Sequence, residues 1–191
     1  KHKIYKTRDH LSFSNIKIGI YGIGEIGKVV ANDLLSLGFE VIGWSRTKKK
    51  IASFKTFYGK DGFLTLNKTV DIHICLLPLT DETKNIFDKS FFELTKYGIC
   101  FINAGRGEHL VEEDFLKFCD LKKINLAFLD VFKTEPLPKK HPFWQHKKII
   151  ITPHVSAETN IETAAKQVAN AIRLIHLGKV AKNQISLIKG Y

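Results

Sequence analysis

The sequence is marked first by what it lacks. Its 191 residues include no methionine, and no run reaches the about 18 apolar residues that a membrane-spanning helix requires. No secretory signal is visible either. These absences exclude a membrane protein and favour a cytoplasmic one. The missing methionine and the start at Lys1 indicate a processed N-terminus or part of a longer polypeptide, and the motif positions described below favour the second.

Cysteine is also scarce. The three cysteines, Cys75, Cys100 and Cys119, are odd in number and lack the spacing of metal ligands. We interpret all three as reduced thiols in the core of a cytoplasmic protein, and we expect no metal site. Hydrophobic residues make up 44% of the chain, which is enough for one full domain with a core of its own.

Acidic residues are outnumbered by basic ones, which gives a net charge of +11. Such a charge suits an anionic partner, either nucleic acid or a phosphorylated ligand. The lysines, however, are scattered through expected loops with no aromatic residues between them. We therefore interpret most of them as solvated surface charge and expect no nucleic-acid partner. The cluster at Arg46 is the exception.

Short apolar runs alternate with segments of helical periodicity along the chain. Strands are expected at residues 16–21, 39–44, 71–77 and 99–103, and two more are expected to end near Phe132 and Thr152. Helices are expected at residues 26–37 and 63–67, after the N-cap Asp88, from residue 112, and at residues 158–177. This order is typical of a doubly wound parallel α/β sheet, and six strands would complete a Rossmann-type dinucleotide-binding domain.

Three parts follow from these assignments. Residues 1–15 are polar and basic, and we interpret them as a linker or the remnant of a preceding domain. Residues 16–157 are the expected NAD(P)-binding domain. Residues 158–191 are the expected C-terminal helix and tail.

A G-x-G-x-x-G motif lies between the first expected strand and the first expected helix, the context in which it binds a dinucleotide. Gly22 permits the tight turn, Gly24 lets the backbone approach a pyrophosphate, and Gly27 lets the helix pack closely on the strand. Glu25 and Ile26 open the helix, whose N-terminal N–H groups face the phosphates. The motif therefore predicts a dinucleotide site.

The second expected strand ends without an acidic residue. A site that prefers NAD places Asp or Glu there, about 20 residues after the glycines, to bind the ribose 2′-hydroxyl. This chain instead reads Trp44-Ser45-Arg46-Thr47-Lys48, which offers a guanidinium, hydroxyls and an ammonium to a 2′-phosphate. We predict that NADP(H) is preferred, with NAD(H) as the weaker alternative.

Polar side chains follow three of the expected strands. Glu135 and His154 come after the last two strands, and Arg106 leaves the fourth, so all three are expected at the sheet edge where such folds bind ligands. Hydride transfer to a 2-oxo acid needs a cation for the substrate carboxylate, an acid for the carbonyl oxygen and a carboxylate that orients the acid. Arg106, His154 and Glu135 fit these roles, while the hydride comes from the cofactor.

The chain resembles the D-isomer-specific 2-hydroxyacid dehydrogenases. The matching segments occur in family order: the glycine motif at 22–27, Leu76-Leu77-Pro78-Leu79-Thr80, Asn103-Ala104-Gly105-Arg106-Gly107, Asp130-Val131-Phe132 with Glu135-Pro136-Leu137, and Thr152-Pro153-His154. Residues 44–47, 142–146 and 190–191 resemble the glyoxylate/hydroxypyruvate reductase branch of that family.

The resemblance implies a role for each matching residue. Arg106 would bind the substrate, His154 would donate the proton, and Glu135 would assist it. The other implied contacts are with the cofactor: Asp130 at the nicotinamide amide, Pro78 and Thr83 on the adenosine side, and Ala104, Gly105, Ser156 and Ala157 towards the nicotinamide half through their backbone. Leu77, Asn103, Arg106 and His154 are also expected among the cofactor contacts.

Family members also carry a substrate-binding domain, built mainly from a segment before the dinucleotide fold, where this chain has only residues 1–15. The leading hypothesis is therefore the cofactor-binding and catalytic half of an NADPH-dependent reductase of a small 2-oxo acid, homodimeric when intact. The alternative is a non-catalytic NADP-binding fragment. A nucleic-acid binder is a third hypothesis that rests on charge alone.

Overall fold

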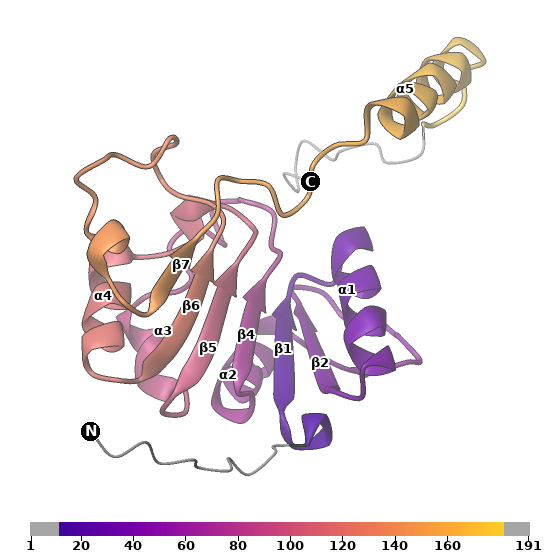
Figure 1. Ribbon diagram of the computed structural model, residues 1–191. Coiled ribbons are helices and arrows are strands. Elements are labelled where there is room, and N and C mark those ends of the chain that lie inside the picture. Colours follow the sequence, from indigo (N-terminus) through magenta and orange to yellow (C-terminus); the bar gives the residue numbers. More distant parts are fainter. Residues whose placement is uncertain (1–11, 182–191) are drawn as a thin grey trace.

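A parallel sheet with helices on both faces organises residues 12–181, the part of the chain that the computed structural model describes (Figure 1). The sheet has seven strands in the order β3-β2-β1-β4-β5-β6-β7. Their bounds are β1 Lys17–Tyr21, β2 Glu40–Ser45, β3 Lys55–Tyr58, β4 Ile72–Cys75, β5 Ile99–Asn103, β6 Ile124–Leu129 and β7 Ile149–Ile151. The doubly wound α/β fold expected from the sequence is confirmed.

Two hydrophobic cores lie on opposite faces of the sheet. The helices are α1 Glu25–Ser36, α2 Gly59–Thr69, α3 Lys89–Leu94, α4 Glu112–Asp120 and α5 Ile161–His176, with short 3-10 helices η1 Phe13–Asn15, η2 Gly107–His109 and η3 Pro142–Gln145. Under α2, α3 and α4 the core is rich in phenylalanine, including Phe91, Phe92 and Phe101. The smaller core under α1 is mostly aliphatic and includes Ile20 and Ala31.

The sheet has one strand more than the six expected, because β3 carries no apolar run. Its sequence, Lys-Thr-Phe-Tyr, is only partly buried, and it pairs with β2 at one edge of the sheet. The next helix is also longer than the expected 63–67, since α2 begins at Gly59. Gly62 interrupts its apolar pattern for a packing reason: a Cβ there would lie 2.9 Å from the Cβ of Phe57.

Side chains outside α3 form hydrogen bonds with backbone groups at both ends of this helix. Asp88 caps the N-terminus as expected, since its Oδ1 accepts a hydrogen bond of 3.0 Å from the Phe91 N–H. At the C-terminus, the buried ammonium of Lys123 donates to three carbonyl oxygens at residues 92–95. Lys148 donates in the same way to a carbonyl at the end of α4. Both lysines stabilise carbonyls that have no partner within their helix.

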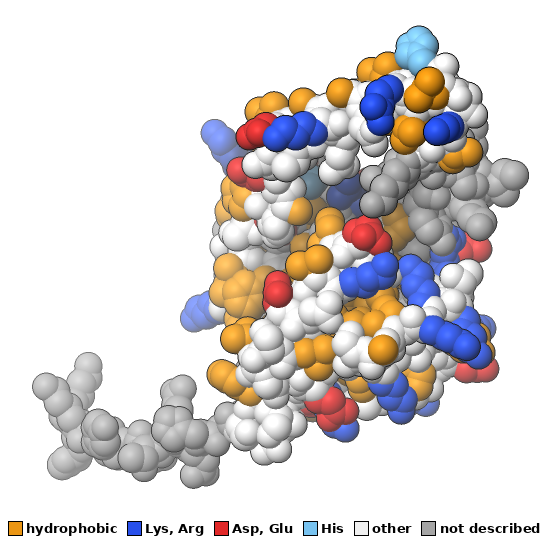
Figure 2. Space-filling model, turned by 90° about the vertical axis from the view of Figure 1, so that its right-hand side faces the viewer, with side chains coloured by type: hydrophobic (Ala, Val, Ile, Leu, Met, Phe, Trp, Pro, Cys, Tyr) orange, Lys and Arg blue, Asp and Glu red, His pale blue; other side chains and the backbone are white. Residues whose placement is uncertain are grey.

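The final helix, α5, lies within the expected range 158–177 and begins after the N-cap Asn160. It stands apart from the sheet in Figure 1. Its apolar stripe, which includes Val168, Ile172 and Ile175, is more than half exposed. Figure 2 shows apolar side chains along α5 and also over the side of the domain that carries α1, where Ile26 and Val29 are exposed.

Residues 1–11 and 182–191 lie outside the described residues. Most of the predicted N-terminal linker and the similarity at Gly190-Tyr191 therefore lie outside them too. Within residues 12–181, no helix is both long and apolar enough to cross a membrane.

Candidate functional site

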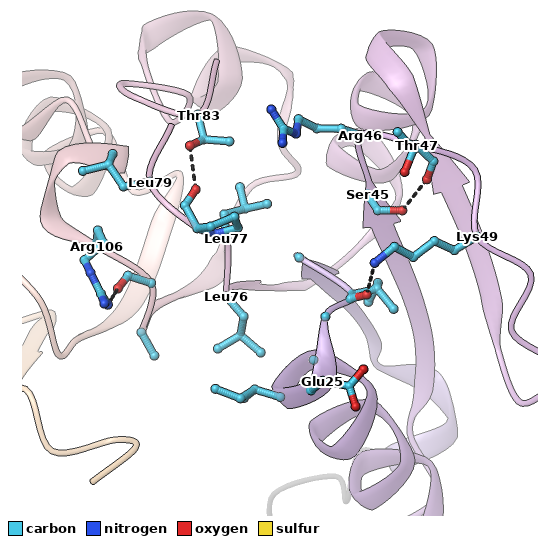
Figure 3. Close-up of a pocket in the computed structure, with 18 residues that line it drawn as sticks. Glu25, Ser45, Arg46, Thr47, Lys49, Leu76, Leu77, Leu79, Thr83 and Arg106 are labelled. Atoms are coloured by element: carbon cyan, nitrogen blue, oxygen red, sulfur yellow. Dashed lines mark hydrogen bonds between the residues drawn. The ribbon is translucent and has the colours of Figure 1, made fainter. Parts of the chain in front are cut away.

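A cavity of about 610 Å³ opens at the C-terminal edge of the sheet, close to the ends of β1 and β4. At this point the order of the strands reverses: β2 and β3 follow β1 on one side, and β5, β6 and β7 follow β4 on the other. Open α/β sheets bind ligands at such a switch point. Loops after β1, β2, β4 and β5 form the walls, so residues far apart in the sequence face each other across the cavity (Figure 3).

The glycine motif forms one wall and has the shape that a pyrophosphate requires. Gly22 has a φ of +107°, and a Cβ there would lie 2.5 Å from the carbonyl oxygen of Leu76. A Cβ at Gly27 would lie 2.1 Å from the carbonyl oxygen of Gly22. Around Gly24, by contrast, the described residues leave open space within 4 Å of the Cβ position. The backbone is thus open to a ligand where α1 begins, and the residues fit a bound dinucleotide.

The loop after β2 forms the basic end of the cavity. Ser45, Arg46 and Thr47 line it, as expected. The Arg46 guanidinium forms an ion pair with Glu82, which comes from the loop after β4 on the opposite wall and is 70% exposed. Lys49 also lines the cavity, and its ammonium donates to the carbonyl oxygen of Ile23 at 2.6 Å.

Two residues of the segment 44–48 that were predicted to contact the cofactor do not line this cavity. Trp44 is only 5% exposed, packs in the aromatic core, and donates from its indole N–H to the carbonyl oxygen of Gly59. The Lys48 ammonium lies over the ring of Tyr58 on β3, 5.9 Å from its centre. The lysine that lines the cavity is instead Lys49, which lies in a run of three lysines in the sequence.

The opposite wall comes from the loop after β4. Leu77, Pro78 and Thr83 line it as expected, and Leu76 and Leu79, which were not predicted, add apolar surface. The Thr83 hydroxyl is buried, donates to the Pro78 carbonyl oxygen at 2.7 Å and accepts from the Thr80 N–H at 2.8 Å. Thr83 therefore shapes the wall through its side chain.

A tight turn after β5 carries Ala104, Gly105 and Arg106 to the far end of the cavity. Asn103, predicted among the cofactor contacts, is fully buried and holds this turn: its Oδ1 accepts from the Gly105 N–H, and its Nδ2 donates to the Arg106 carbonyl oxygen, each at 3.1 Å. The next residue must be glycine, because a Cβ at Gly107 would lie 1.9 Å from the Phe132 carbonyl carbon.

Glu135 and His154 meet at this edge of the sheet. Glu135 Oε2 lies 2.8 Å from His154 Nδ1, and its Oε1 accepts from the Phe132 N–H at 2.9 Å. Burial alone would raise the pKa of Glu135, but these hydrogen bonds and the nearby charge of Arg106 lower it below its ordinary value. Glu135 is therefore a carboxylate at neutral pH.

A second, mostly apolar cavity of about 410 Å³ adjoins this pair. It is lined by both members of the pair and by Phe132, Pro136, Leu137, Trp144, Ile151 and Pro153. Within residues 12–181, no group of three or more His, Cys, Asp or Glu side chains could hold a metal ion.

The segment that carries His154 is tied to Asp130. This carboxylate accepts hydrogen bonds from the Thr152 hydroxyl and from the N–H groups of Val155 and Ser156, at 3.0 and 2.9 Å. His154 itself has a φ of +55°, a conformation that few non-glycine residues adopt. Asp130 thus holds a constrained segment in place, and its predicted contact with the nicotinamide amide stays a prediction.

Ser156 and Ala157, also predicted near the nicotinamide, are exposed beyond this segment and do not line the 610 Å³ cavity. The Ser156 N–H is already engaged by Asp130.

Replacing Asp130 with Asn should lower the free energy of unfolding by about 1–3 kcal/mol, because partly buried N–H groups would lose a charged acceptor. Burial acts to raise the pKa of Asp130, but its three hydrogen bonds outweigh burial and lower it. The stabilisation is therefore full above the unfolded pKa of about 3.9 and is lost as the pH falls through the lower folded pKa. Urea unfolding at pH 7 and in acid measures it.

The matched control is Asp88→Asn, which keeps an N-cap side chain and should change stability by no more than a few tenths of a kcal/mol. A loss for Asp130→Asn that is the same at both pH values would contradict this assignment.

Comparison with known proteins identifies the class that this fold and site define. The family model for the D-isomer specific 2-hydroxyacid dehydrogenase, NAD binding domain, matches residues 1–156. The chain belongs to this family, whose members are oxidoreductases that act on CH–OH donors.

One curated relative is glyoxylate/hydroxypyruvate reductase A from Serratia proteamaculans (strain 568), which is 40% identical over 93% of this chain and 56% of that protein. The protein of the same name from Photorhabdus laumondii is 41% identical over 91% of this chain and 56% of that protein. The chain therefore spans little more than half the length of these relatives.

Solved structures agree with this. A D-isomer specific 2-hydroxyacid dehydrogenase from Xanthobacter autotrophicus Py2, in complex with NADPH and MES, has a TM-score of 0.94 at 32% identity, over 98% of this chain and 77% of that one. An NADPH-dependent glyoxylate/hydroxypyruvate reductase from Sinorhizobium meliloti, in complex with NADP and sulfate, has a TM-score of 0.92 at 32% identity, over 98% and 60%.

Proposed function

We propose that this chain is the cofactor-binding and catalytic half of an NADPH-dependent reductase that converts a small 2-oxo acid, of the glyoxylate or hydroxypyruvate type, to the 2-hydroxy acid. The observation that carries the proposal is the hydrogen-bonded pair of Glu135 and His154, 2.8 Å apart, at the sheet edge that also bears the dinucleotide cavity. The relatives from S. proteamaculans and S. meliloti are named for this activity.

The basic end of the cavity supports NADP(H) as the preferred cofactor. Arg46 and Lys49 bring two cations to this end, and Ser45 and Thr47 bring hydroxyls. A 2′-phosphate gains charge-assisted hydrogen bonds from such a set, whereas a ribose 2′-hydroxyl finds no carboxylate in the segment 45–49 to accept its proton.

Each residue of the pair has a defined task in the reduction. His154 Nδ1 is engaged by Glu135, so Nε2 is the atom that delivers a proton to the substrate carbonyl oxygen. The Glu135 carboxylate orients the imidazole and favours its charged form. Arg106 holds the substrate carboxylate with its planar fork. The cofactor, when bound, supplies the hydride.

We further propose that the intact protein is a cytoplasmic homodimer. The exposed apolar side chains of α1 and α5 leave surface for contacts with further parts of such a protein, and unpaired cysteines suit a reducing compartment.

A second candidate is a non-catalytic NADP-binding fragment. The observation that favours it is the cavity itself, because residues of this chain alone form its lining. The chain spans 56% of the S. proteamaculans reductase, and in this candidate only the cofactor cavity would be functional.

Titration of the chain with NADPH and NADH, followed by cofactor fluorescence, tests the cofactor proposal: NADPH should bind more tightly. NADPH oxidation by the full-length gene product, with glyoxylate or hydroxypyruvate, tests the reaction. Tight NADPH binding without turnover would favour the non-catalytic candidate, and weak binding of both cofactors would contradict both.

A further inference from the structure

His109 is a fully buried histidine that lies between two walls of the dinucleotide cavity without lining it. It ends the short helix η2, three residues after Arg106. Its imidazole contacts the loop after β5 on one side and the loop after β4 on the other. None of the motifs described above includes His109.

The hydrogen bonds of His109 fix one tautomer of its ring. The Arg106 N–H donates to Nδ1 at 3.0 Å, so Nδ1 carries the lone pair. The proton is therefore on Nε2, which lies 3.3 Å from the Pro78 carbonyl oxygen and donates to it. Burial lowers the pKa of His109, which keeps this neutral form at physiological pH.

The imidazole also packs directly against the turn that presents Arg106. A Cβ at Gly105 would lie 3.0 Å from His109 Nδ1 and 3.0 Å from the Cys75 sulfur. The turn therefore has no room to shift towards the ring. Because Pro78 also accepts a hydrogen bond from Thr83, its carbonyl oxygen joins the imidazole to the whole β4 loop.

We propose that His109 is a positioning residue for Arg106 and for the cavity wall at Pro78. Its imidazole bridges the loop after β5 and the loop after β4. The bridge fixes the distance between the Arg106 backbone, which presents the substrate arginine, and the Pro78 wall, which faces the cofactor. The inference rests on the proposed function, since it assigns Arg106 to the substrate and Pro78 to the cofactor. A side chain that only filled space would not need a hydrogen-bond partner for each of its ring nitrogens.

His73 provides a matched control, because it is equally buried but distant from this role. It lies in β4, its Nδ1 shares a hydrogen bond of 3.0 Å with the Tyr21 hydroxyl, and within the described residues its Nε2 has no partner. It lines neither cavity described above. Substitution of His73 therefore reports what the loss of a buried imidazole does to the fold alone.

The test compares His109→Leu, His109→Gln and His73→Leu in the full chain. Leucine removes the hydrogen bonds with Arg106 and Pro78 and the weaker contact with the Cys75 thiol, whereas glutamine can accept from Arg106 and donate to Pro78. His109→Leu should raise the Kd for NADPH about tenfold, and it should lower kcat/KM for the 2-oxo acid by about ten- to a hundredfold, because small displacements of a substrate-binding group cost that much. His109→Gln should stay near the wild-type values, and His73→Leu should leave the Kd unchanged.

Equal Kd values for His109→Leu and the wild type would overturn the proposal, and so would equal losses in the leucine and glutamine variants. If His109→Leu does not fold, His109→Asn replaces it, because its shorter amide cannot span both loops, and the same rise in Kd is expected.

A ligand-free measurement separates this inference from the proposed function. In ¹⁵N-labelled wild-type chain, the hydrogen bond should give a scalar coupling between the Arg106 amide nitrogen and His109 Nδ1, and its absence would refute the bridge whatever the chain binds. Failure of the proposed function would appear differently, as a wild-type chain that shows the coupling but neither binds NADPH nor turns over.

Discussion

Replacing Arg46 with Asp should raise the Kd for NADPH about a hundredfold, which corresponds to about 3 kcal/mol, while the Kd for NADH changes by much less. The variant removes a charged donor from the basic end of the cavity and puts a carboxylate beside the 2′-phosphate, but it offers the NADH ribose an acceptor. Fluorescence titration with both cofactors measures the two values. Equal losses for both would contradict the assignment of Arg46 to the 2′-phosphate.

Glu82→Gln is the control for this experiment, because it breaks the ion pair with Arg46 but keeps the guanidinium. An exposed pair of this kind contributes no more than about 1 kcal/mol, so NADPH should bind about two- to fivefold more tightly once the competing carboxylate is gone. NADH binding should not change. Weaker NADPH binding would mean that Glu82 holds Arg46 in place for the cofactor.

Replacing His154 with Ala should lower kcat in the full-length protein by about 10²- to 10⁴-fold, the usual contribution of a positioned acid. The loss of NADPH affinity should be far smaller, because the cavity walls described above stay intact. Steady-state NADPH oxidation and cofactor titration give the two numbers. A loss of cofactor binding as large as the loss of kcat would assign His154 to the cofactor rather than to proton delivery.

Glu135→Gln tests the partner of His154. The amide keeps the size of the side chain but cannot favour a charged imidazole, so kcat should fall by less than in His154→Ala. The lowered pKa of Glu135 sets a pH window: the contribution of its carboxylate is full above the ordinary pKa of about 4.3 and is lost as the pH falls through the lower folded pKa. A variant whose kcat equals that of the wild type at neutral pH would exclude an orienting role for Glu135.

Patterns with a strict physical requirement could be predicted from the sequence. The glycine motif needs glycine at fixed backbone positions, and the N-cap at Asp88 needs a short side chain with an acceptor oxygen. Both lie where expected. The β3 strand was missed because an edge strand with partial burial needs no apolar run. Pattern alone therefore finds the buried strands more readily than those at the edge.

Side-chain direction was the part of the site that could not be predicted. Trp44 follows the alternation of β2 into the core, whereas Lys48 and Lys49 are neighbours in a lysine run and only the second enters the cavity. His109 shows the same limit, because a single histidine in a polar turn carries no periodic signal. Its partners, Arg106 and Pro78, come together only when two loops meet in space.

The two lysines that close helix ends change how the net charge of +11 should be understood. Lys123 and Lys148 direct their ammonium groups at main-chain carbonyls near helix C-termini. They act as fixed positive charges opposite the negative ends of these helix dipoles. The carbonyl dipoles that they face stabilise these two charges locally. Both amines must break these hydrogen bonds before they can react with an acylating reagent, so they should be modified more slowly than the exposed lysines of the chain.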